Sequence, residues 1–492
     1  MSQVLFGQSY YLRFDPKLFA AMQPYPPLGT LYAASFLRER NYRVQLFDAV
    51  LAGSVEEWRD ALQRCTPRYA VIYEDNFNYL SKMCLTRMRE AAFQMIQSGK
   101  AFGCVVIFCG ADATDHYAKY LDCGADFVLR GEGEETLAEL LDTLEGRVER
   151  RVETIAGLAF KDCSGHPCAN TRRPEISQLD GMPLPAWDLV DTARYRKIWM
   201  DRHGYYSINM VTTRGCPYHC NWCAKPIWGQ THNSRSPENV VQELQWLKHN
   251  VRPDHVWFAD DIFGLKPGWV EKFGRLVRQH EAGIPYKCLL RPDLVTPSLV
   301  EGLRMSGCRS VWMGAESGSQ KILDAMEKGT TVDQIRRACR LLREAGIEVG
   351  FFIQYGYPGE NEREIKATLG MIRQCMPDDI GISISYPLPG TSFYEGVRSQ
   401  LGEKKNWSDS DDMAMLYQGP FPKSFYPALY HATHSEFRMR RAWNRLKRDA
   451  GRPSCWRLKH ARWLTIAAGN ALKYSLHGTR LHRELRAASS RS

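Results

Sequence analysis

Residues 212–223 read TTRGCPYHCNWC and follow a short apolar run. Within them, Cys216, Cys220 and Cys223 have the spacing C-x₃-C-x₂-C, and the aromatic Trp222 directly precedes the last thiol. Three thiolates at this spacing can bind three irons of a 4Fe–4S cluster and leave the fourth iron without a protein ligand. We therefore expect Cys216, Cys220 and Cys223 to be the metal ligands of this protein.

Two other interpretations of this stretch stay open. A structural zinc site needs a fourth ligand; His219 is the candidate, but its position between two of the cysteines gives it poor reach to the same metal. Alternatively, the three thiols are unrelated buried side chains. The spacing, the aromatic residue and the position after a strand favour the cluster. Most of the other cysteines are scattered singly, which is typical of small buried hydrophobic residues.

Strands and helices alternate regularly around this stretch, from about residue 200 to residue 400. Helices of 10 to 18 residues are predicted between the strands. Six strand-helix units predict an incomplete (β/α)₆ barrel, whose chemistry would lie at the carboxyl ends of its strands. The predicted strands are 207–212, 255–259, 286–290, 310–313, 349–354 and 380–385.

A second α/β region precedes this barrel. Strand-like runs at 2–6, 43–48, 69–73 and 104–109 alternate with helical sequence over residues 1–145, which predicts a doubly wound parallel sheet. Ligands of such sheets bind outside the carboxyl ends of the strands, so we expect binding residues at 74–78 and 110–114. Residues 146–199 are predicted to be a linker with a small hairpin, and residues 401–492 a basic helical region.

The cysteine stretch resembles the motif C-x₃-C-x-aromatic-C of the radical S-adenosylmethionine (SAM) superfamily. Three further stretches resemble that family: WMGAESGS at 312–319, FFIQYGYPGE at 351–360, and FADD at 258–261, where acidic residues replace the usual Gly-Gly-Glu. The resemblance implies that the open iron binds SAM and that a 5′-deoxyadenosyl radical is formed. The residues that it places around SAM are Asp261, Arg291, Glu316 and, beside the adenine, Trp222.

The first region also carries a resemblance. Residues 23–34, QPYPPLGTLYAA, and 124–137, GADFVLRGEGEETL, resemble the cobalamin-binding domain of one radical SAM subgroup, which includes the anaerobic magnesium-protoporphyrin ester cyclase, hopanoid-modifying enzymes and C- and P-methyltransferases. Gly110, Gly131 and Gly133 would allow the backbone to approach the corrinoid, or they merely form turns. No Asp-x-His-x-x-Gly motif offers a lower histidine ligand, so the 74–78 loop would face the lower side of the cobalt.

The two resemblances together imply a cobalamin-dependent radical SAM enzyme that uses a 4Fe–4S cluster, SAM and cobalamin. We expect an anaerobic methyltransferase that acts at an unactivated carbon or at phosphorus of a natural-product, lipid-like or tetrapyrrole substrate. Its electron donor would be a flavodoxin or a ferredoxin. The alternatives are an oxidative cyclase or another carbon-skeleton-modifying enzyme, and a non-catalytic corrinoid carrier or sensor. Methylthiotransferases are disfavoured because no second cysteine set has ligand spacing.

Charge is concentrated at the end of the chain. Residues 431–492 contain fifteen Lys and Arg against three acidic residues, so their net charge is +12 and that of the other residues is −2. This segment is either a solvated basic helix or a peripheral contact with an anionic membrane surface; no nucleic-acid-binding fold is evident. We see no secretory signal and no apolar run of membrane-spanning length, and expect a cytoplasmic protein, with membrane association as the alternative.

Overall fold

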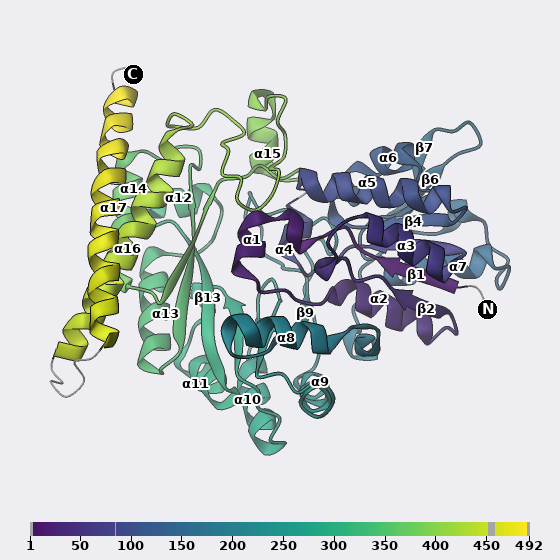
Figure 1. Cartoon of the computed structure of the whole chain (residues 1–492), viewed down its shortest axis with the longest axis horizontal. Coiled ribbons are helices and arrows are strands. Elements are labelled where there is room, and N and C mark those ends of the chain that lie inside the picture. The colour runs from purple at the N-terminus through teal and green to yellow at the C-terminus, as the bar shows by residue number, and fades with distance from the viewer. Residues whose placement is uncertain (1–2, 84, 451–457, 490–492) are drawn as a thin grey trace.

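The computed structural model describes residues 3–83, 85–450 and 458–489. Two β-sheets with flanking helices lie side by side, and a helical hairpin covers the far side of the second sheet (Figure 1). The predicted α/β class, with a doubly wound sheet before a curled parallel sheet and a helical C-terminal region, is confirmed.

The first sheet has the strand order β2-β1-β3-β4-β5-β6-β7, and its first five strands in sequence are parallel. Helices cover both faces, because the central strands are apolar on both sides: one core lies under α3, α5 and α6, and the other lies under α2 and α7. The strands are β1 (Gln3–Gly7), β2 (Arg43–Leu46), β3 (Tyr69–Tyr73), β4 (Val105–Cys109) and β5 (Phe127–Leu129). The helices are α1 (Pro16–Ala21), α2 (Leu28–Arg38), α3 (Glu56–Cys65), α4 (Tyr79–Lys82), α5 (Thr86–Ala101), α6 (Ala111–Cys123) and α7 (Glu134–Leu144).

The predicted hairpin of the linker extends this sheet. Its strands β6 (Leu158–Lys161) and β7 (Pro167–Ala169) pair antiparallel, and β6 also pairs antiparallel with β5. Pro167 therefore stands in the outermost strand, opposite Lys161. The boundaries 1–145, 146–199, 200–400 and 401–492 stay predictions, and α8 (Thr192–His203) occupies the end of the predicted linker.

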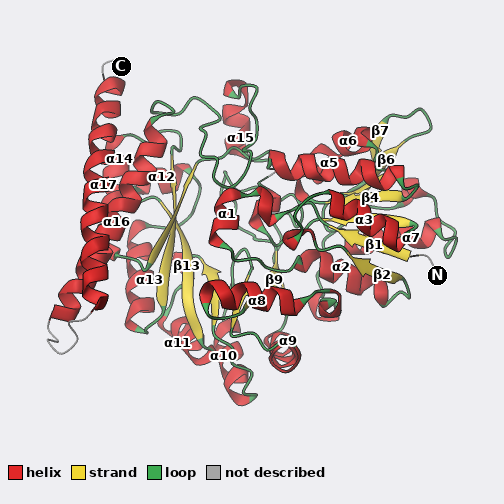
Figure 2. Cartoon of the chain, viewed as in Figure 1, coloured by secondary structure: helices red, strands yellow, loops and turns green. Residues whose placement is uncertain are grey.

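The second sheet contains six parallel strands in the order β15-β14-β13-β12-β11-β8. Figure 2 shows its yellow strands with red helices along one side. Helices pack against its outer face. Two of them, α10 and α11, approach closely, since a Cβ on Gly274 would lie 2.6 Å from the carbonyl oxygen of Gly302. The strands are β8 (Ser207–Met210), β11 (His255–Phe258), β12 (Tyr286–Leu290), β13 (Cys308–Glu316), β14 (Glu348–Tyr355) and β15 (Asp379–Ile384). The helices are α9 (Pro237–Asn250), α10 (Trp269–Gln279), α11 (Pro297–Ser306), α12 (Gln320–Ala325), α13 (Val332–Glu344), α14 (Glu362–Cys375) and α15 (Ser392–Val397).

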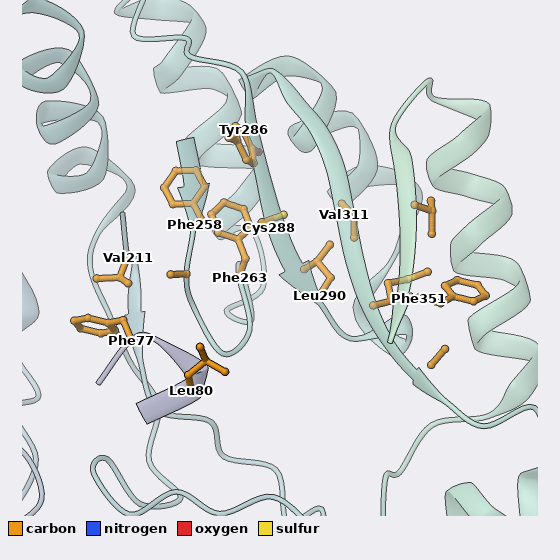
Figure 3. Packing of buried hydrophobic residues seen from close by; sticks show 14 of the residues in the cluster. Phe77, Leu80, Val211, Phe258, Phe263, Tyr286, Cys288, Leu290, Val311 and Phe351 are labelled. Atoms are coloured by element: carbon orange, nitrogen blue, oxygen red, sulfur yellow. The ribbon is translucent and has the colours of Figure 1, made fainter. Parts of the chain in front are cut away.

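One hydrophobic core continues from the second sheet into the first region. Phe77 and Leu80, which follow β3, lie near Val211, which follows β8 (Figure 3). The Phe77 ring also stacks on Trp228 of the second region, with ring centroids 4.9 Å apart. Burial of these apolar side chains against one another fixes the carboxyl ends of the first sheet beside the loop that follows β8.

The C-terminal hairpin consists of α16 (Phe425–Ala450) and α17 (Leu458–Ser489). The buried Glu436 of α16 anchors the hairpin to α14, because both carboxylate oxygens accept hydrogen bonds from Arg373 of that helix, at 2.6 and 2.8 Å. No helix in the described ranges is long and apolar enough to cross a membrane.

Candidate functional site

The cysteine loop begins directly after β8 and a two-stranded ladder that pairs β9 (Thr213–Arg214) with β10 (Asn233–Ser234). Gly215 has a φ of +82°, and a Cβ there would lie 2.4 Å from the carbonyl oxygen of Thr231, so the turn into the loop requires glycine. Further along, the Asn221 amide donates to the carbonyl of Met326 at 3.1 Å, which holds the loop against the end of α12.

The three thiols lie in this one loop and are partly exposed. The amide of Cys223 donates to the carbonyl of Cys220 at 3.1 Å, and burial raises the pKa of the Cys223 thiol to about 12. In the part of the chain that the structure describes, no three His, Cys, Asp or Glu side chains are grouped closely enough to hold a metal ion. The cluster ligands Cys216, Cys220 and Cys223 therefore stay a prediction, while His219 is exposed.

Cations surround the cysteine loop. Lys225 donates to the carbonyl of Tyr218 within the loop, and the guanidinium of Arg291 lies 3.8 Å from the Cys220 sulfur. Lys82 reaches the loop from the first region, and Lys328 lies 5.9 Å from the Trp222 ring centroid. A concentration of positive charge favours an anionic centre, as thiolate-bound clusters are.

Arg291 and Glu316 meet through Lys328. The ammonium of Lys328 forms a buried ion pair with Glu316 at 2.9 Å. The backbone carbonyl of Lys328 accepts a hydrogen bond from Arg291 at 2.7 Å. Arg291 also stacks on the ring of Tyr218 at 3.5 Å. Glu316 has a φ of +56°, an uncommon backbone conformation for a residue with a side chain. Backbone strain of this kind is found at functional sites. Arg291, Glu316 and Lys328 thus form a group of charged side chains beside the cysteine loop.

The two neighbouring acids after β11 have different environments. Asp260 is buried and accepts four hydrogen bonds from the amides and hydroxyls of Thr212 and Thr213, at 2.7 to 3.0 Å, so it shapes the strand end. Asp261 instead faces the first region and forms an ion pair with Lys82 at 2.5 Å. Its predicted contact with SAM is not tested by this pairing.

The three glycines proposed for corrinoid binding lie at the carboxyl edge of the first sheet. A Cβ on Gly110 would meet Glu74 Cγ at 2.7 Å, and one on Gly133 would meet Cys109 Sγ at 2.7 Å. Gly131 has a φ of +79°, which favours glycine at its turn. Close packing therefore explains why positions 110 and 133 require glycine. A role of the three glycines in cofactor binding stays a prediction.

Buried polar atoms without partners gather at the same edge. Gln8 Nε2, Glu74 Oε2 and Asn76 Oδ1 have no hydrogen-bond partner among the described residues. A cavity of about 20 Å³, enough for one water molecule, is lined by Glu74, Ser81 and Gly110 among others. Burying polar atoms without partners is costly, so these donors and acceptors fit a polar ligand at the end of β3.

A buried ion-pair network, absent from the sequence predictions, joins the two regions. Arg214, just before the cysteine loop, pairs with Glu132 of the loop after β5 and, at 2.9 Å, with Glu134, the first residue of α7. Tyr73 donates to Glu134 at 2.9 Å. All are buried. The repeated acids in Arg130-Gly131-Glu132-Gly133-Glu134 were the available signal, but their cationic partner lies some eighty residues away.

Residues 210–372 match the family model described as the radical SAM superfamily. The chain carries a radical SAM domain. This domain includes the whole cysteine loop and runs from the end of β8 to α14, and it makes the protein a radical SAM enzyme.

Two relatives match across both regions of this radical SAM enzyme. An uncharacterized methyltransferase of Pyrococcus horikoshii is 26% identical over 396 residues, which cover 78% of this chain and 81% of the relative. The anaerobic magnesium-protoporphyrin IX monomethyl ester cyclase of Rubrivivax gelatinosus is 23% identical over 389 residues, which cover 77% of this chain and 67% of the relative.

Two solved structures share the fold. The cobalamin-dependent SAM radical enzyme OxsB, with aqua-cobalamin bound, superposes with a TM-score of 0.73 at 18% identity, covering 97% of this chain and 72% of that one. The radical SAM methyltransferase TsrM of Kitasatospora setae, with cobalamin and a [4Fe-4S] cluster bound, gives 0.68 at 19% identity, covering 81% and 78%. The arrangement of a doubly wound sheet before a partial barrel is therefore shared with both.

Proposed function

We propose that this radical SAM enzyme is a cobalamin-dependent methyltransferase. The observation that carries the proposal is the meeting of two sets of strand ends. Lys82 of α4, which follows β3, pairs with Asp261, and Glu132 of the loop after β5 pairs with Arg214; Asp261 and Arg214 both lie beside the cysteine loop. A cofactor at the carboxyl ends of the first sheet would thus lie beside chemistry at the cysteine loop.

Each predicted residue has a role in this proposal. Cys216, Cys220 and Cys223 hold the cluster, and the surrounding cations balance its charge. The residues proposed to bind and orient SAM are Asp261, Arg291, Glu316 and Trp222. The residues proposed to cradle cobalamin are Gly110, Gly131 and Gly133 with the unpartnered polar atoms of Gln8, Glu74 and Asn76. When bound, the cluster with SAM supplies an organic radical and cobalamin supplies a methyl group.

The methyl acceptor is proposed to be an unactivated carbon or phosphorus of a small molecule. The relative named as a methyltransferase supports methyl transfer, and the cyclase relative supports oxidative cyclisation as the alternative. The chain's own part is to hold the acceptor between the two strand-end sets in a reactive geometry. A flavodoxin or ferredoxin is proposed as the electron donor, docking where the cysteine loop is partly exposed.

We also propose that α17 lets the protein contact an anionic membrane surface from a cytoplasmic location. Leu464, Leu472 and Leu476 are 48%, 65% and 63% exposed, and their spacing places them within one face of the helix. Basic residues of the same helix, including Lys473 and Arg480, would attract anionic headgroups.

Anaerobic reconstitution tests the proposed function. The full chain should bind iron, sulfide and a corrinoid, and Cys223→Ala should lose iron and sulfide while it still binds corrinoid. Cys163→Ala, at an exposed cysteine of the β6–β7 turn, is the matched control and should retain all three. Retention of iron and sulfide by Cys223→Ala would contradict the cluster assignment.

The reaction is identified by comparing the metabolites of a deletion strain with those of its parent. Methyl transfer predicts a product that is one CH₂ heavier than the accumulated substrate, with formation of S-adenosylhomocysteine. Formation of 5′-deoxyadenosine without S-adenosylhomocysteine would favour cyclisation instead. An intact metabolite profile in a Cys223→Ala strain would favour the non-catalytic carrier.

A further inference from the structure

The inner face of the second sheet is lined differently from its outer face. Side chains alternate along each strand, and those that point outward, such as Cys288, Val311 and Phe351, pack against the helices (Figure 3). The opposite face carries Trp257, Lys287, Trp312 and others, which are less buried. The strand ends of this inner face lead to the cysteine loop.

Aromatic side chains dominate the middle of the inner face. Trp312 of β13 and Phe352 of β14 lie with ring centroids 4.9 Å apart, and Phe352 is 39% exposed. Glycine neighbours give them room: a Cβ on Gly350 would lie 2.3 Å from the Trp312 ring, and one on Gly381 would lie 3.3 Å from both rings. The sheet therefore presents a broad aromatic surface.

A lysine side chain lies next to this surface. Lys287 is paired in register with Trp257, and its ammonium lies 5.0 Å from the Trp257 ring centroid and 5.6 Å from that of Tyr25. No carboxylate in the described ranges forms an ion pair with it. Burial lowers the pKa of Lys287 to about 8, so the side chain is still mostly protonated at neutral pH.

Two buried acceptors on the same face lack donors. Asn209 is paired in register with Trp257, and Gln354 lies two residues beyond Phe352 on β14. Asn209 Oδ1 and Gln354 Oε1 have no hydrogen-bond partner among the described residues, although both residues are almost fully buried. Each can accept a hydrogen bond from a bound molecule.

We propose that the inner face binds the methyl acceptor, and that this acceptor is a flat, largely apolar molecule with an anionic group that pairs with Lys287. The inference rests on the proposed function, since it describes the substrate of the same site. Trp312 and Phe352 stack on the flat part, and the partly buried Lys287 ammonium, which forms no ion pair with a described carboxylate, pairs with a carboxylate, sulfonate or phosphate. Lys287 is paired in register with Ser310 of the neighbouring strand, and Trp312 lies two residues beyond Ser310. At ordinary strand spacings, the backbones of Lys287 and Trp312 are therefore roughly 8 Å apart.

A matched pair of fluorescent ligands tests the inference. The full chain, prepared anaerobically with its cofactors, is titrated with 1-pyrenebutyrate, which is anionic, and with 1-pyrenebutanol, which is neutral. We expect the anion to bind roughly tenfold more tightly or better, the effect of a charge-assisted hydrogen bond. Lys287→Met should abolish the preference for the anion and leave the binding of 1-pyrenebutanol unchanged. Lys287→Arg should keep the preference for the anion.

Two further variants locate the binding. Trp312→Ala should weaken both ligands about three- to tenfold through loss of ring stacking, and Lys366→Met, at an exposed lysine of α14, should change neither. Equal binding of the two ligands by the wild type, no detectable binding of either, or a preference that survives in a folded Lys287→Met protein would overturn the inference. Binding requires no turnover, so these outcomes are separate from those of the methyl-transfer assay.

Discussion

Burial changes the charge of Glu360, which lies in the loop after β14. One carboxylate oxygen accepts a hydrogen bond from the Gly356 amide at 2.6 Å, and the other, Oε1, has no partner among the described residues. Burial raises the pKa of this carboxyl to about 8, from an ordinary value of 4.5. The folded protein therefore binds a proton here at pH values where the unfolded chain has lost it.

Proton binding by Glu360 makes the free energy of unfolding depend on pH. Because the folded pKa is raised, the contribution of Glu360 is fully present below about pH 4.5 and is lost as the pH rises toward 8. In Glu360→Gln this loss disappears, so the stability of the variant relative to wild type should increase by more than about 1 kcal/mol between pH 5 and pH 8. Denaturant unfolding at both pH values measures it.

The exposed neighbour Glu362, which pairs with Lys366, provides the control. Glu362→Gln should follow the wild-type curve at both pH values. A constant difference between Glu360→Gln and the wild type would show that Glu360 is ionised throughout, and would contradict the prediction.

Single residues also mark the limit of what the sequence could predict. The stretch around Cys216 was identifiable because its ligand spacing lies within one loop. Lys287 and Trp257 gave no such signal, because they become neighbours only when β11 and β12 pair in register. The role of Asp260 was missed for a similar reason, since its hydrogen-bond donors Thr212 and Thr213 follow a different strand, β8, some fifty residues earlier in the chain.

At the scale of elements, the strands of the second sheet were predicted closely. Predicted strand 286–290 coincides with β12, and the others differ by one to three residues at their ends. Short apolar runs bounded by charged helices fix such strands locally. The helix α8 was not predicted, because its sequence is charged and polar around most of its surface and only Tyr195 and Trp199 are buried.

The exposed face of α17 supports a test of membrane contact. The wild-type protein should sediment with vesicles that contain anionic phosphatidylglycerol and not with neutral phosphatidylcholine vesicles. The double variant Leu472→Asp, Leu476→Asp should lose this sedimentation, because it removes apolar contact and adds negative charge. Both side chains are more than 60% exposed, so the fold should be retained.

A variant in another exposed apolar residue serves as the control for that test. Trp246→Asp, on α9, should still sediment with the anionic vesicles. Point variants are preferable to removing the hairpin, since α16 buries Leu429 and Phe437 in the core. Equal sedimentation of the double variant, or none by the wild type, would contradict membrane contact through α17.

At the scale of the whole molecule, the order of the two sheets was predicted but their contact was not. Order follows from local patterns along the chain. The contact depends on Phe77 packing against Trp228 and on Arg214 reaching Glu132 and Glu134, and long-range partners of this kind leave no local pattern. The two regions nevertheless share one continuous core.

Loss of the Arg214 guanidinium should destabilise the whole molecule. Arg214→Met leaves two buried carboxylates without their cation and should lower the free energy of unfolding by about 3–5 kcal/mol. Both regions should still unfold in one transition. Circular dichroism and tryptophan fluorescence, measured during the same denaturant titration, should give the same midpoint. Removing the acids as well, with Glu132→Gln and Glu134→Gln, should recover part of the loss.

The matched control is an exposed ion pair. Arg38 and Asp188 are 2.6 Å apart at the surface, so Arg38→Met should change stability by less than about 1 kcal/mol. A loss of similar size in the two arginine variants would show that Arg214 does not join the regions.

The position of Pro167 in the outermost strand has a consequence for how copies of this protein behave together. An open sheet edge invites another chain to add a strand, and that is a common route to aggregation. A proline has no N–H to donate to such a strand, and β7 is only three residues long. At high concentration, copies of the protein are therefore hindered from adding strands to one another at this edge. The β6–β7 hairpin thus ends the sheet and protects it from aggregation.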